Sequence, residues 1–103
     1  MFVVREFWGN YEHLPAVFDD YDAAYSCLER RYNAEKNKFE KFNRNKTLKE
    51  DCPPSRETGT AVFRSRRKDM WHSLRWRIEE MDDSAFSKVM AEYDRNEELR
   101  MSR

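Results

Sequence analysis

The chain has 103 residues, of which 39% are charged, and its formal net charge at pH 7 is zero. The length is typical of one folding unit, so we expect a single domain over residues 1–103, with a small core built from the many aromatic side chains. No apolar run approaches the roughly 20 residues that cross a bilayer, and the N-terminus lacks a signal-peptide pattern, which predicts a cytoplasmic protein that does not enter membranes.

The zero net charge hides blocks of opposite sign that alternate along the chain. Residues 6–29 carry six acidic side chains and no Lys or Arg, whereas residues 30–49 carry eight basic and two acidic ones. Residues 61–77 are basic again, and residues 79–98 are acidic. Such blocks can attract one another within the fold, or they can leave an acidic and a basic face that steer partners.

The N-terminal segment predicts a β-hairpin. Residues 2–8 are rich in β-forming side chains, Gly9-Asn10 is a turn signal, and residues 14–18 form a second short apolar run. Pro15 places the start of that second strand at a sheet edge. We therefore expect residues 2–8 to pair with residues 14–18.

Residues 20–44 are the clearest predicted helix. Asp19 or Asp20 is a suitable N-cap, and lysines gather toward the C-terminal end, as the helix dipole favours. Apolar residues recur at near-helical spacing, namely Tyr21, Ala24, Tyr25, Leu28, Tyr32, Phe39 and Phe42. Because only two of them anchor residues 36–46, a shorter helix that ends near Asn37 is the alternative. Residues 45–59 follow as a predicted flexible loop, with two prolines, a terminal glycine and few apolar side chains.

The next segment, residues 64–81, supports two readings. As a hairpin strand after residues 60–65, it places Leu74, Trp76 and Ile78 on one side and Trp71, Arg75 and Arg77 on the other. As a helix, it aligns Met70, Trp71, Leu74, Ile78 and Met81. We favour the strand because residues 60–65 have β-forming composition and a short connection can close the hairpin.

The last segment predicts a second helix, capped by Asp82 or Asp83, with a frayed tail over residues 100–103. Its apolar stripe consists of Phe86, Val89, Met90 and Tyr93. The predicted order is β-β-α-loop-β-β-α. The fold class is therefore α+β, a small antiparallel sheet with two helices packed on one face.

Catalytic and metal-binding signatures are missing from the sequence. Two glycines cannot form a glycine-rich phosphate loop, and His13 and His72 are the only histidines. Cys27 falls on the predicted inner side of a helix and Cys52 in the predicted loop, so we expect both to be reduced and to have no catalytic role. The acidic clusters stand where helix caps need them. We expect no enzymatic activity, no cofactor and no metal.

One stretch resembles a known class of proteins. The sequence "AVFDDYDAAYSCLERR" resembles the hairpin-to-helix step of small uncharacterised phage-encoded α+β proteins, and "MFVVREFWGN" and "LRWRIEEMD" fit the same outline. The lysine-rich end of the first helix and the C-terminal helix depart from it. The resemblance implies a host-directed protein that binds and disables a host enzyme or defence complex, as anti-CRISPR proteins do.

The leading functional hypothesis is a non-enzymatic, phage-type protein that binds and modulates or inhibits a host protein or nucleoprotein complex in the host cytoplasm, as a monomer or a homodimer. The alternative is a nucleic-acid-binding accessory protein that uses a basic and aromatic surface over residues 64–77. The net charge of zero argues against that alternative, since dedicated nucleic-acid binders are usually basic. The candidate partner-binding residues are Trp71, Arg75, Arg77, Arg66, Arg67, Trp8 and Tyr11.

Overall fold

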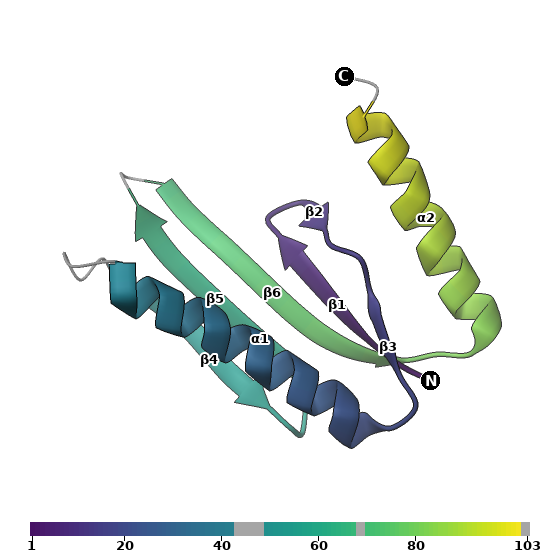
Figure 1. Ribbon diagram of the computed structural model, residues 1–103, viewed down its shortest axis with the longest axis horizontal. Coiled ribbons are helices and arrows are strands. Elements are labelled where there is room, and N and C mark those ends of the chain that lie inside the picture. Colours follow the sequence, from purple (N-terminus) through teal and green to yellow (C-terminus); the bar gives the residue numbers. More distant parts are fainter. Residues whose placement is uncertain (43–48, 68–69, 102–103) are drawn as a thin grey trace.

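The computed structural model of the protein describes residues 1–42, 49–67 and 70–101 (Figure 1). Along the chain, the elements are β1 (Phe2–Trp8), β2 (Tyr11–Glu12), β3 (Ala16–Phe18), α1 (Tyr21–Phe42), β4 (Lys49–Ser55), β5 (Thr60–Arg67), β6 (Met70–Glu80) and α2 (Asp83–Met101). The fold is α+β, as the sequence predicts.

All the strands belong to one antiparallel sheet in the order β2-β1-β6-β5-β4, and β3 also pairs with β1. The predicted N-terminal hairpin is confirmed for β3, while β1 turns through Gly9 into β2 as well. Strand β6 lies in the middle of the sheet, paired with β1 on one side and β5 on the other. The helical reading of residues 64–81 is therefore wrong, because two neighbouring strands take up the backbone hydrogen bonds of β6.

Helix α1 covers one face of the sheet and forms the core with it. From the helix, the buried side chains are Ala24, Cys27, Leu28, Tyr32 and Phe39, and from the sheet they are Val4, Ala61, Phe63 and Trp76. Tyr32 meets the rings of both Phe63 and Trp76 edge to face, with centroids 6.1 Å apart. The predicted phase of β6 is confirmed, since Leu74, Trp76 and Ile78 all pack on this side.

The bounds of α1 match the prediction to within two residues at each end. Asp20 caps the helix, since its Oδ1 accepts a hydrogen bond of 2.7 Å from the backbone N–H of Ala23. The alternative end near Asn37 is wrong. Phe39 is only 7% exposed and packs against Phe63, with ring centroids 5.5 Å apart, and this contact holds the last turns on the sheet.

The predicted loop over residues 45–59 is wrong for residues 49–55, which form the edge strand β4; residues 45–48 lie outside the described residues. The two prolines in β4 do not prevent pairing, because an edge strand leaves one side of its backbone without a neighbour. The ladder with β5 is irregular between Cys52 and Ser55, which is where the prolines stand. A turn then ends at Gly59, whose φ of 66° lies in the left-handed region.

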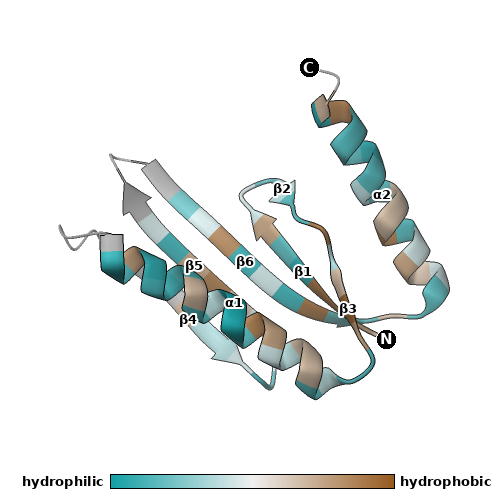
Figure 2. Cartoon of the chain, viewed as in Figure 1, coloured by the Kyte–Doolittle hydropathy of each residue, from teal (hydrophilic) through white to brown (hydrophobic). Residues whose placement is uncertain are grey.

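Helix α2 lies beyond the β2 and β3 side of the sheet and does not stand beside α1 on the covered face (Figure 1). The predicted stripe of Phe86, Val89, Met90 and Tyr93 is only half-buried, and no residue of α2 is fully buried. Figure 2 shows its apolar residues mixed with hydrophilic ones. The expectation that both helices pack on one face thus holds for α1 alone.

The direction of α2 is set at its junction with β6. Met81 donates its backbone N–H to the carbonyl of Met1 at 2.9 Å and accepts a hydrogen bond of 3.0 Å from the N-terminal amine. Asp82 caps the helix through the N–H of Ala85. The helix continues to Met101, so two residues of the predicted frayed tail are helical, and residues 102–103 lie outside the described residues. No helix in the described part of the chain is long and apolar enough to span a membrane.

Candidate partner-binding surfaces

The sheet face opposite α1 carries a group of arginines. Because side chains alternate along a strand, the residues that follow the core positions of β1, β5 and β6 point to this second face. Register places Arg5 opposite Arg77, and Phe7 opposite Arg75. We call this surface the arginine face, and it consists of Arg5, Phe7, Glu12, Val62, Arg64, Arg75, Arg77 and Glu79. Helix α1 lies on the other side of the sheet; the Val3 end of the arginine face, opposite Glu79, is fully buried, whereas Arg75 and Arg77 are exposed.

Phe7 stands at the centre of the arginine face. The guanidinium carbons of Arg5, Arg75 and Arg77 lie 5.3, 5.5 and 5.0 Å from the centroid of its ring. A ring face is electron-rich, so it attracts cations and offsets part of their mutual repulsion. The half-buried phenylalanine therefore gathers three positive charges at one place on the sheet.

Two carboxylates neutralise part of this charge. Arg5 donates two hydrogen bonds to Glu12, at 2.8 and 2.7 Å, and lies 3.4 Å from Glu79. The hydrogen bonds to Glu12 raise the pKa of the Arg5 guanidinium above its ordinary value, so Arg5 stays charged. Arg77 pairs with Glu79 at 2.6 Å, and its side chain is 46% exposed against 14% for Arg5. Arg5 is thus held by ion pairs within the sheet, while the side chains of Arg75 and Arg77 are exposed to solvent.

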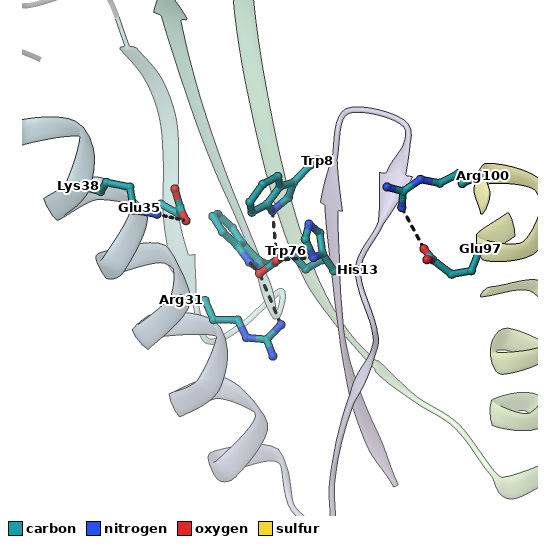
Figure 3. A network of polar contacts seen from close by, with 9 residues as sticks. Trp8, His13, Arg31, Glu35, Lys38, Trp76, Glu97 and Arg100 are labelled. Carbon is teal, nitrogen blue, oxygen red and sulfur yellow. Dashed lines mark hydrogen bonds and ion pairs between the residues drawn. The ribbon is translucent and has the colours of Figure 1, made fainter. Parts of the chain in front are cut away.

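On the α1 side of β1, the carboxylate of Glu6 joins three elements, and Figure 3 shows its partners Trp8, Trp76, Arg31 and His13 converging. It accepts hydrogen bonds from the indole N–H groups of Trp76, at 2.5 Å, and Trp8, at 3.1 Å. Arg31 of α1 lies 3.5 Å away, and Nδ1 of His13 lies 3.9 Å away. The carboxylate acts as a common acceptor that fixes the β1–β2 turn against α1 and β6.

A cavity of about 350 Å³ opens beside this carboxylate, between the segment after β2 and α1, with His13 and Arg31 in its wall. Nε2 of His13 is buried without a hydrogen-bond partner. The imidazole is packed between rings, with centroids 4.3 Å from Trp8 and 4.8 Å from Tyr11. In the described part of the chain, no group of three or more His, Cys, Asp or Glu side chains could hold a metal ion. The hydrogen bonds to Glu6 and the ring contacts of His13 support a structural role for this network.

Tyr11 links the β1–β2 turn to the end of α2. The guanidinium carbon of Arg100 lies 3.6 Å from the centroid of its ring, and Arg100 also pairs with Glu97 at 3.0 Å (Figure 3). Partial burial, together with a hydrogen bond to Glu97, raises the pKa of the Tyr11 hydroxyl. A cleft of about 620 Å³ separates the two elements and is lined in part by Trp8, Tyr11 and Tyr93.

The structure divides the candidate residues from the sequence into separate groups. Arg75 and Arg77 lie together on the arginine face. Trp8, which is 47% exposed, and the half-buried Tyr11 lie instead at the β1–β2 turn beside α2. The side chains of Trp71, Arg66 and Arg67 lie outside the described residues, and only their backbone is placed, in the β5–β6 ladder.

The sequence analysis did not single out five residues of the arginine face, namely Arg5, Phe7, Glu12, Val62 and Glu79. The alternation of Val3, Arg5 and Phe7 along β1 was the available signal, because it sets these three apart from the core-facing Val4.

Comparison of the chain with models of protein families, with curated proteins and with solved structures finds no match.

Proposed function

We propose that this chain is a non-enzymatic protein that binds a host protein or nucleoprotein complex through the arginine face and modulates or inhibits it. The observation that carries the proposal is the group of three arginines gathered on one phenylalanine on the sheet face opposite α1, two of which, Arg75 and Arg77, are exposed. Exposed arginine and aromatic side chains are enriched among the residues that dominate binding energy at protein interfaces.

The charge on the face indicates the chemistry of the partner. Three arginines, Arg5, Arg75 and Arg77, gather on Phe7 against the two carboxylates of Glu12 and Glu79, so an acidic surface would be attracted to this part of the arginine face. Arg75 has no carboxylate partner among the described residues, and Arg77 is nearly half exposed. Both can form new ion pairs without breaking the support that Glu12 gives to Arg5.

The host-directed part of the proposal rests on the resemblance of the hairpin-to-helix step to small phage-encoded proteins. An anti-defence protein of this kind would act in the cytoplasm of the host cell, by occupying a surface that its target needs. Tagged protein should recover a stoichiometric partner from lysate of its natural host, with and without nuclease treatment. Failure to recover one at both low and moderate salt would contradict the proposal.

A nucleic-acid-binding accessory role is the second candidate, and the surplus of arginine on the same face favours it. Phosphate contacts through Arg75 and Arg77 would make binding fall steeply as salt rises, because counterions are released when the contacts form. The cap of guanidinium groups on Phe7 weighs against base stacking on that ring. Loss of the recovered partner after nuclease treatment, together with steep salt dependence of binding to purified nucleic acid, would favour this role over the first.

A further inference from the structure

Two exposed groups of side chains in the described part of the chain carry opposite charges. One is Arg75 and Arg77 of the arginine face, and the other is a group of acidic side chains on α2, a helix in which no residue is fully buried. The described molecule measures 46 × 38 × 17 Å, which leaves room for only the sheet and one helix layer along its shortest axis. In the described part of the chain, the sheet and α1 thus form two layers, and an antiparallel sheet of this kind commonly leaves its second face open to water.

Three of the five acidic residues of α2 lie on one flank. At 100° per residue, Asp83, Asp94 and Glu98 fall within about a sixth of the helix circumference. All three are exposed. Lys88 and Arg95 lie on a different side of the helix. We call Asp83, Asp94 and Glu98 the acidic flank of α2.

The junction with β6 sets the direction in which α2 leaves the sheet. Only Met81 and Asp82 separate it from β6. Two backbone hydrogen bonds hold Met81 to Met1, and Asp82 caps the first turn. The helix therefore leaves the end of β6 in a fixed direction, beyond the β2 and β3 side of the sheet (Figure 1).

We infer that a second copy of this chain covers the arginine face with the acidic flank of its α2 when no host partner occupies that face, and that the two copies do so reciprocally in a symmetric dimer. The nineteen residues of α2 span about 28 Å, enough to cross the roughly 19 Å between the outer strands of the five-strand order. Asp94 and Glu98 would meet Arg75 and Arg77. A reciprocal contact of this kind closes on itself and gives a dimer rather than a filament.

Dimerisation is measured on the purified chain alone, so its outcome is independent of the proposed host partner. Light scattering during gel filtration should give twice the 12.6 kDa of one chain at high concentration. Arg75→Glu with Arg77→Glu should weaken the dimer about tenfold or more, and so should Asp94→Arg with Glu98→Arg, because each places like charges face to face. Mixing the two double variants should restore a dimer with one copy of each.

Matched controls carry the same change of charge at exposed helix positions outside both surfaces. They are Arg30→Glu with Lys88→Glu, and Glu29→Arg with Glu92→Arg. Both should dimerise like the unchanged chain. A monomer at every concentration would overturn the inference, and so would a dimer that all these variants leave intact or a mixture that stays monomeric. Circular dichroism on each double variant confirms that a monomeric variant is folded.

Discussion

The indole N–H of Trp76 donates a hydrogen bond of 2.5 Å to Oε1 of Glu6, the residue directly opposite it on the neighbouring strand. Trp76 is 1% exposed and packs against Tyr32 of α1, so its only polar group is satisfied from within the sheet. The same carboxylate accepts a hydrogen bond from Trp8 and faces Arg31. The Glu6 carboxylate thus accepts hydrogen bonds both from the buried Trp76 of the core and from Trp8 at the β1–β2 turn.

Glu6→Ala should lower the free energy of unfolding by about 1–3 kcal/mol, because it leaves the buried indole N–H of Trp76 without an acceptor. Glu6→Gln keeps an acceptor oxygen and should cost less. Urea denaturation of the two variants measures the difference. Trp8→Phe is the control, since Trp8 is an exposed donor to the same carboxylate and should change stability little. Equal stability of the Glu6→Ala variant and the unchanged chain would contradict the role of this carboxylate.

Gly59→Ala should destabilise the fold more than Gly9→Ala. Both glycines have positive φ, which costs another residue about 1–2 kcal/mol. A Cβ at Gly59 would also lie 3.0 Å from the hydroxyl oxygen of Tyr21 and 3.3 Å from Cβ of Ile78, whereas a Cβ at Gly9 would meet nothing within 4 Å. Comparing the melting temperatures of the two variants separates the cost of backbone strain, which both share, from the cost of the crowded Cβ at residue 59. An equal loss in both variants would show that the turn before β5 adjusts freely.

Phe39→Ala should release the last turns of α1 from the sheet. Burial of Phe39 against Phe63 is the described aromatic contact that holds this end, and deleting a buried phenylalanine side chain typically costs about 3–5 kcal/mol. Hydrogen exchange of the backbone amides in residues 36–42 should accelerate more than that of residues 24–32. Uniform acceleration along the whole helix would mean that α1 opens only as a unit.

The free energy of unfolding should fall as the pH rises above about 10, the ordinary pKa of tyrosine. Partial burial raises the pKa of both Tyr11 and Tyr25 in the folded chain. A group with a raised folded pKa stabilises the fold fully below its unfolded pKa and loses that contribution as the pH passes the folded value. Tyr11→Phe with Tyr25→Phe should flatten the decline. Urea midpoints from about pH 8 to about pH 11 measure it, and an unchanged decline in the double variant would exclude these hydroxyls as the cause.

Much of the fold follows from patterns within single segments. Alternation along residues 70–80 predicts which side of β6 meets the core, and the helical spacing with an aspartate cap predicts α1. The sequence did not predict the edge strand β4 because Pro53 and Pro54 are typical of loops. A strand accommodates them only at the edge of a sheet, where one side of its backbone has no neighbour.

The placement of α2 and the composition of the arginine face depend on contacts between segments far apart in the sequence. The stripe of α2 indicates which side of the helix is apolar but not what it contacts, and the hydrogen bonds between Met1 and Met81 decide its direction. Likewise, only the register between β1 and β6 brings Arg5 and Phe7 to Arg75 and Arg77. Predicting the surface from the sequence would have required that register.

The most direct test of the proposed function compares partner recovery by three forms of the tagged protein from nuclease-treated lysate of the natural host. These are the unchanged chain, the variant with Arg75→Glu and Arg77→Glu, and the control with Arg30→Glu and Lys88→Glu. Binding through the arginine face predicts that the unchanged chain and the control recover the same stoichiometric protein, and that the arginine-face variant loses it. Equal recovery by all three forms would contradict the account.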